Sequence, residues 1–133
     1  MEKFVLDACA IIAFLKAEAG FERMEEVFIG TRSGEIELFM SAVTFGEVCL
    51  YLYKNLTFEK AKKQIEEIQN LWNINFIDAN IKDSNQAGYI KSLAGLGYPD
   101  CFVLVLAKNL NATILTKDKE FQKFEREFRI EWL

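Results

Sequence analysis

The residues best suited to chemistry in this sequence are acids at predicted strand ends and helix starts. Four such acids are spread along the chain, namely Asp7, Glu47, Asp100 and Asp118. The chain has no histidine, so it lacks the commonest general base and transition-metal ligand. Converging carboxylates repel one another unless a cation lies among them, and their oxygens prefer hard cations. If the four acids meet in space, we therefore expect a site for Mg²⁺ or Mn²⁺.

Each acid also has an ordinary structural explanation. Thr44 and Glu47 match the capping box of a helix start, and Asp100 would favour the positive end of a helix. Asp7 and Asp118 suit turns or caps equally well. Because no single acid decides between such a role and chemistry, the prediction of a site depends on the joint arrangement.

Strand-like and helix-like stretches alternate along the chain. The predicted strands cover residues 4–6, 37–42, 74–79, 112–116 and 128–133. The predicted helices cover residues 10–15, 44–53, 58–71, 81–93, 101–107 and 117–124, with Thr57 and Asn80 as caps of the third and fourth. This alternation favours an α/β fold with a mostly parallel sheet covered on both faces. Right-handed crossovers gather the carboxyl ends of such strands at one edge, where the four acids would share a cleft.

The stretch 101–107 fits a buried strand as well as a buried helix, because it is apolar throughout. Pro99 and Asp100 precede it, and proline suits the first turn of a helix. A crossover is also needed before the parallel strand predicted at 112–116. Both points favour a helix here.

Length and composition limit the class of protein. At 133 residues, of which 51% are hydrophobic, the chain fits one domain with a single core, residues 1–133. Three widely spaced cysteines give neither a disulfide framework nor a four-thiolate zinc site, so we expect a reducing, cytoplasmic location. The sequence shows no basic leader and no apolar run near the ~20 residues that span a bilayer, so we expect no membrane partner. A net charge of −4 argues against nucleic-acid binding through a broad positive field.

Four blocks of this sequence, taken together, resemble the sequence blocks of PIN domains and follow the same order. They are VLDACAII at 5–12, SAVTFGEV at 41–48, GYPDC at 97–101 and ILTKDKEF at 114–121. The resemblance implies a three-layer α/β/α sandwich around a central parallel sheet. It also implies that Asp7, Glu47, Asp100 and Asp118 bind a divalent metal for phosphodiester hydrolysis.

The chain is most similar, in length and lack of appended domains, to VapC-type toxins of toxin–antitoxin pairs. That resemblance implies a ribonuclease with an RNA substrate and a cognate antitoxin, and it also underlies our expectation of a homodimer. Thr116 matches the hydroxyl that precedes the last acid of the family, and Glu120 is a candidate fifth acid or part of a solvated helix face. Cys9 is a departure, because the family often has serine two residues after the first aspartate.

Several side chains near the acids are candidates for contact with RNA. The basic candidates are Lys16, Lys117, Lys119 and Lys123, for which a solvated face is the alternative. Tyr98, beside Asp100, is the aromatic side chain we would assign to base stacking. Cys9 and Cys101 adjoin acids whose charge raises the pKa of a thiol, so we expect packing residues rather than nucleophiles.

Other functions remain to be weighed at this stage. A PIN domain of this kind is also compatible with a stand-alone RNA-processing nuclease, or with a domain that binds RNA or protein without catalysis. Phosphoryl transfer to an aspartate, as in haloacid-dehalogenase-like phosphatases, shares the fold class but needs a second aspartate where Cys9 stands. A receiver domain would need a pair of acids after the first strand, where this chain has only Asp7.

Overall fold

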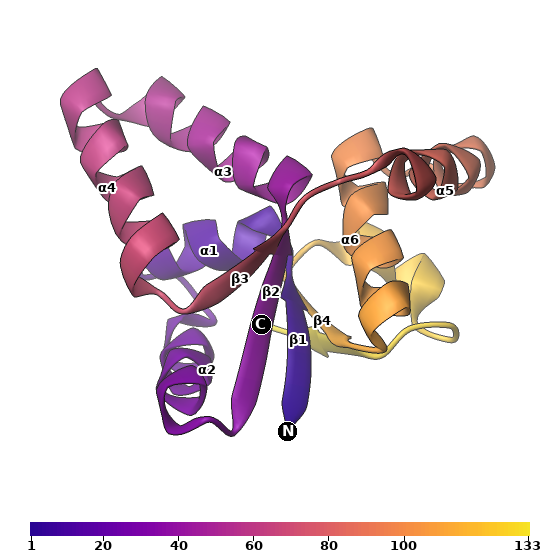
Figure 1. Cartoon of the computed structure of the whole chain (residues 1–133), viewed down its shortest axis with the longest axis horizontal. Helices are drawn as coiled ribbons and strands as arrows, with labels where there is room; N and C mark the ends of the chain where they lie inside the picture. The colour runs from indigo at the N-terminus through magenta and orange to yellow at the C-terminus, as the bar shows by residue number, and fades with distance from the viewer.

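Five strands form one sheet in the order β3-β2-β1-β4-β5, and every neighbouring pair is parallel (Figure 1). The computed structural model describes residues 1–133. The strands are β1 (Glu2–Leu6), β2 (Ile36–Ser41), β3 (Ile74–Ile77), β4 (Thr113–Thr116) and β5 (Ile130–Trp132). The predicted mostly parallel sheet is confirmed, and β1 lies at its centre between β2 and β4.

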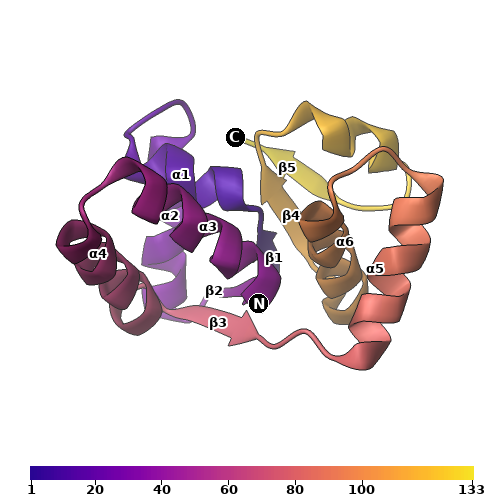
Figure 2. The ribbon, with the colours of Figure 1, turned by 90° about the horizontal axis from the view of Figure 1, so that it is seen from above.

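Helices cover both faces of this sheet, as the α/β/α prediction requires. They are α1 (Ala8–Leu15), α2 (Phe21–Ser33), α3 (Ala42–Asn55), α4 (Phe58–Leu71), α5 (Ile81–Leu93), α6 (Tyr98–Leu110) and the 3₁₀ helix η1 (Lys119–Phe124). Seen from above, α1 to α4 lie on one side of the sheet, and α5 and α6 lie on the other (Figure 2). The ambiguous stretch 101–107 is helical, as predicted, and lies within α6.

Alternation along the strands divides the core into two apolar clusters. Phe4 and Leu6 of β1 pack with α1 to α4, whereas Val5 between them packs with α6 on the opposite face. Successive side chains of a strand point to opposite faces, so β1, β2, β3 and β4 each contribute side chains to both clusters. The helix that follows β1 and the helix that precedes β4 consequently lie on different faces of the sheet.

Helix α2 has no counterpart among the predicted elements. It buries Met24, Val27 and Phe28 at the three- and four-residue spacing of an amphipathic helix. However, it begins after Gly20 and ends before Gly34, and neither end has a side-chain cap. The polar start signal that indicates other helices in this chain, such as Thr57 before α4 and Asn80 before α5, is therefore missing here.

The C-terminal strand is fastened to the N-terminal half of the chain. Arg23 of α2 donates hydrogen bonds from Nε and Nη2 to both carboxylate oxygens of Glu131, at 2.6 and 3.0 Å. Beyond β5, the backbone N–H of Leu133 donates to the carbonyl of Thr116 at 3.0 Å. Gly20 has a φ of +97°, and a Cβ there would lie 2.8 Å from the Cβ of Leu133, so only glycine fits.

No single helix of the chain is long and apolar enough to cross a membrane. Helices α5 and α6 have the length and composition of a membrane span only when they are taken together, and the chain bends by 118° between them.

Candidate metal-binding active site

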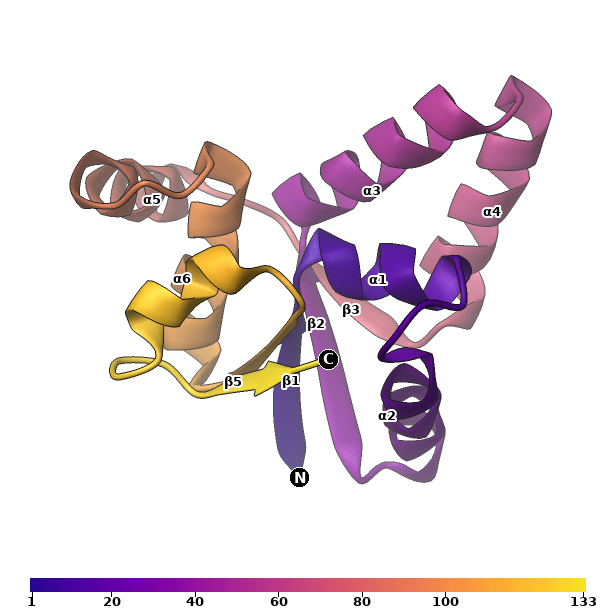
Figure 3. The ribbon, with the colours of Figure 1, turned by 180° about the vertical axis from the view of Figure 1, so that it is seen from behind.

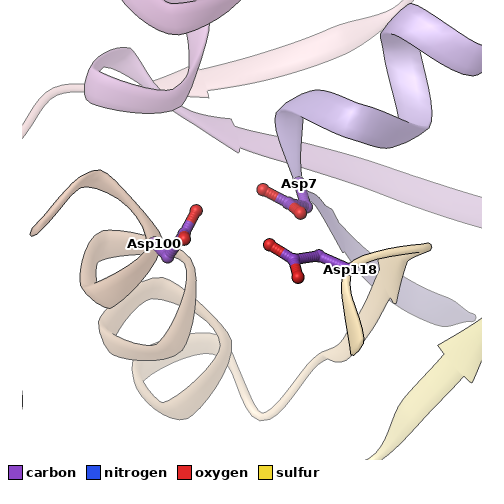
Figure 4. A group of neighbouring side chains, drawn as sticks. All are labelled: Asp7, Asp100 and Asp118. Carbon is purple, nitrogen blue, oxygen red and sulfur yellow. The ribbon is translucent and has the colours of Figure 1, made fainter. Parts of the chain in front are cut away.

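Three of the four predicted acids meet at the carboxyl edge of the sheet. One carboxylate oxygen each from Asp7, Asp100 and Asp118 lies within 4.8 Å of the other two. Asp7 follows β1, Asp118 follows β4, and Asp100 lies in the first turn of α6, with all three side chains pointing into one space (Figure 4). The structure therefore brings three of the four predicted acids together at this edge.

Asp7 is the most buried and most firmly held of these acids, with 3% of its surface exposed. Its Oδ1 accepts a hydrogen bond from the backbone N–H of Ala8 at 2.8 Å, which caps α1. Its Oδ2 accepts from the Thr116 hydroxyl at 2.9 Å and from the Cys9 thiol at 3.1 Å. Burial raises the pKa of Asp7, and these hydrogen bonds oppose that rise by favouring the carboxylate.

Thr116 links two acids through one hydroxyl. Its side chain is fully buried, and its Oγ1 donates to Asp7 while accepting from the backbone N–H of Asp118 at 2.9 Å. Asp118 in turn caps η1, because its Oδ1 accepts from the backbone N–H of Glu120 at 3.0 Å. The orientation of Asp7 and the backbone position of Asp118 thus depend on the same oxygen.

Cys9 takes part in this network, a role that the sequence did not indicate beyond its position two residues after Asp7. Its Sγ lies 3.3 Å from Thr116 Oγ1 and accepts from the backbone N–H of Lys117 at 3.2 Å. The thiol therefore makes contacts of the kind that a hydroxyl would make there. Burial, followed by the charge of Asp7, raises the pKa of Cys9 to about 12, so the thiol stays protonated at neutral pH and is no nucleophile.

Asp100 does not cap its helix. The cap of α6 is Gly97, no side chain caps that helix end, and Pro99 occupies the first turn as predicted. Burial, then the charges of Asp7, Glu47, Asp118 and Glu120, raises the pKa of Asp100 to about 7. A half-buried carboxylate surrounded by like charges would be stabilised in its charged form by a cation bound among them.

Glu47 approaches the group from α3 but lies outside the three acids that share the 4.8 Å limit. Its Oε1 is buried and has no hydrogen-bond partner. Burial, and then the charge of Asp7, raises the pKa of Glu47. A buried oxygen without a hydrogen-bond partner is costly unless it meets a ligand or water, so this atom fits contact with a divalent cation or with the water bound to it.

The predicted capping box of α3 is wrong. Ser41, the last residue of β2, caps the helix by accepting from the backbone N–H of Val43 at 3.1 Å. The helix therefore starts earlier than predicted, the Thr44 hydroxyl has no partner, and Glu47 lies in the second turn. Because Glu47 is not a capping residue, its carboxylate is free to serve the site.

No cationic side chain neutralises these acids. The three ion pairs of the structure join Lys16 to Glu18, and Arg23 to Glu26 and Glu131, all away from the site. The remaining candidates lie around the acids: Glu120 is exposed in the first turn of η1, and Lys117 and Lys119 flank Asp118. Tyr98 is 44% exposed and packs edge-on against Phe102. The donor set, all hard oxygens with excess negative charge, fits a divalent cation.

A family model described as the PIN domain matches residues 4–127. The chain belongs to the PIN-domain family. This confirms the resemblance stated from the four sequence blocks, and the matched residues include all four predicted acids. No curated protein is similar enough to this chain to give a match.

Solved structures show the same fold at low sequence identity. A chain of VapBC2 from Rickettsia felis, bound to a DNA fragment from its promoter, superposes with a TM-score of 0.76 at 16% identity, covering 98% of both chains. DNA-bound VapBC from Salmonella typhimurium gives 0.75 at 22% identity, also over 98% of both chains. VapC20 of Mycobacterium tuberculosis, a toxin that cleaves the sarcin–ricin loop, gives 0.73 at 12% identity over 94% of this chain and 95% of that one.

Proposed function

We propose that this PIN domain is a Mg²⁺- or Mn²⁺-dependent endoribonuclease whose active site is formed by Asp7, Glu47, Asp100 and Asp118. The observation that carries this proposal is the set of three carboxylates within 4.8 Å of one another, none of which forms an ion pair with a lysine or an arginine. Family membership supports it, and the structural likeness to a VapC toxin that cleaves RNA agrees with it. In this proposal residues 1–133 work as one catalytic domain.

Asp7, Asp100 and Asp118 would hold the ion, and Glu47 would contact it or its hydration shell. When bound, such an ion supplies positive charge against the phosphate and acidifies coordinated water for attack. The residues of this chain set the orientation of the carboxylates. Thr116 and Cys9 fix the rotamer of Asp7 through two hydrogen bonds to Oδ2, and Thr116 holds the backbone of Asp118 in place.

Asp100 and Glu47 approach the site from helices on opposite faces of the sheet. With a pKa of about 7, Asp100 carries a proton part of the time near neutrality and loses it when a cation binds. Glu47 Oε1, buried and unpartnered, is an acceptor for a hydrogen bond from the attacking water. No nucleophile from the protein is needed, in agreement with the inert thiol of Cys9.

We further propose that the nuclease is the cytoplasmic toxin of a type II toxin–antitoxin pair, because VapBC complexes are among the structures it resembles. Its surface offers a place for a protein partner. Four large apolar side chains are exposed where α3 passes into α4, namely Leu50, Tyr53, Leu56 and Phe58, a set we call the corner patch. The rings of Tyr53 and Phe58 stack at 5.8 Å. Exposed apolar patches of this kind mark protein interfaces.

The direct test is cleavage of a mixed single-stranded RNA pool by the purified protein. We expect fragments with Mn²⁺ or Mg²⁺ and none when a chelator is present. Single-stranded DNA of matched sequence is the control for recognition of the 2′-hydroxyl. Absence of metal-dependent RNA cleavage would refute the nuclease, and binding of RNA without cleavage would favour the non-catalytic alternative.

A further inference from the structure

A groove of about 900 Å³ lies on the flank of the molecule, away from the carboxylates. Its walls come from α5, the second half of α6 and residues 123–129, which comprise the end of η1 and the segment after it. Figure 3 shows these three parts gathered on one side of the sheet, with the C-terminal segment below α5. We call this hollow the flank groove.

The flank groove is positively charged in a chain that is acidic overall. Four basic residues line it, Lys108, Lys123, Arg126 and Arg129, against two acidic ones, Glu125 and Glu127. Arg129 is tied to the backbone by a hydrogen bond from Nη2 to the carbonyl of Asn111 at 2.7 Å. The other three cations are exposed and form no ion pair, although glutamates line the same groove. Unpaired cations gathered in a concavity indicate an anionic ligand.

Aromatic surface accompanies this charge. Tyr89 of α5 is 67% exposed and lines the groove. Phe124 and Phe128 form part of the wall, with their rings edge to face at 6.2 Å. Basic side chains beside exposed aromatic rings are the combination by which proteins hold single-stranded nucleic acid, through phosphates and stacked bases.

The flank groove is built on the same elements as the carboxylate site. Helix α6 carries Asp100 in its first turn and Lys108 eight residues later, a rise of about 12 Å along the helix axis. Similarly, η1 is capped by Asp118 and reaches Lys123, whose Nζ would lie 3.0 Å from a Cβ placed on Gly95. A strand of nucleic acid that extends from the carboxylates along α6 and η1 would enter the flank groove.

We propose that the flank groove binds single-stranded RNA that continues from the scissile phosphate, with Lys108, Lys123 and Arg126 on phosphates and Tyr89 on a base. This inference depends on the ribonuclease function proposed above. An apolar peptide is a poorer occupant, because it would leave three cations without counter-charge.

The test measures binding of labelled single-stranded RNA, long enough to reach both regions, as a function of salt. The groove variant replaces Lys108, Lys123 and Arg126 with glutamine. Its matched control replaces Lys60, Lys62 and Lys63, three exposed lysines of α4, and therefore changes the net charge equally. We expect the groove variant to bind more weakly and to lose about 2 from the slope of log K against log salt, at roughly 0.7 per phosphate contact. The control should keep the wild-type slope. Equal losses in both variants would overturn the proposal.

Substitution at Tyr89 tests stacking. Tyr89→Ala should weaken binding roughly 5- to 100-fold, and Tyr89→Phe, which keeps the ring, should not. Cleavage then separates the two proposals. If wild type cleaves long RNA while the groove variant cleaves it with an unchanged KM, the flank groove is refuted and the nuclease stands. If wild type cleaves nothing, the nuclease is refuted, and the salt slopes still decide the groove. A change in sedimentation of the groove variant would instead identify a protein interface and overturn the proposal.

Discussion

Replacement of Asp100 by asparagine separates a metal ligand from a structural acid. The amide keeps the size of the side chain and removes its charge. Asp100 makes no capping hydrogen bond, so the folded structure loses no contact. At 4.8 Å, two unit charges repel by about 3.5 kcal/mol when the effective dielectric constant is near 20. Asp100 is half-buried, so solvent screening reduces the relief to about 1 kcal/mol.

We therefore expect opposite changes in stability and activity. Without metal at pH 8, Asp100→Asn should melt about 4 °C higher than wild type, the shift that 1 kcal/mol gives in a domain of this size. RNA cleavage should fall by a factor of about 100 or more, as when an essential electrostatic group is removed. The stabilisation by millimolar Mg²⁺, present in wild type, should shrink in the variant.

The assay compares both proteins by thermal melting with and without Mg²⁺, and by cleavage of RNA with Mn²⁺. Asp83→Asn is the matched control, because Asp83 also lies in the first turn of a helix, α5, but outside the carboxylate group. Cleavage by Asp100→Asn at the wild-type rate would refute the assigned role. A variant that melts lower than wild type in the absence of metal would show that repulsion at this site was overestimated.

Three further outcomes are expected. Thr116→Val should lower metal affinity about 10-fold or more, since it removes the hydroxyl that orients Asp7, while Thr116→Ser should restore it; calorimetry would show equal affinities if the link is irrelevant. The folded pKa of Asp100 lies above its unfolded value of about 4, so its contribution to the stability of the metal-free protein should be full below pH 4 and lost as the pH rises through about 7. The rise in melting temperature with Mg²⁺ should consequently be larger at pH 8 than at pH 5, and equal gains would contradict this. Sedimentation at tens of micromolar should show a homodimer, and a persistent monomer would contradict that expectation.

The sequence predicted most of the helices but not α2, and it predicted part of the site. Both α4 and α5 have the predicted bounds, because a capping side chain precedes a run of helix-forming residues in each. The start of α3 was misplaced because two adjacent signals compete. Ser41 caps directly at the end of β2, and the later Thr44–Glu47 spacing only imitates a cap.

Contacts between segments that are far apart in the chain could not be predicted from local sequence patterns. The position of Cys9 suggested a packing residue, whereas its hydrogen bonds join it to Thr116 and Lys117, more than one hundred residues away in the chain. The grouping of Asp7, Asp100 and Asp118 followed from strand order, but the more distant place of Glu47 did not. Distances of this kind depend on how the helices on the two faces pack, which no spacing along the chain records.

The central position of β1 has a consequence for how this protein folds. The first strand in the chain pairs with β2 after a connection that holds α1 and α2, but its other edge stays open until β4 arrives about one hundred residues later. Closing so long a loop is slow compared with local helix formation, so the seam between β1 and β4 should form late. The hydrogen bond from Thr116 to Asp7 crosses this seam. In a partly folded chain Asp7 and Asp118 would thus still lie apart, and the proposed active site would form only with the last cooperative step of folding.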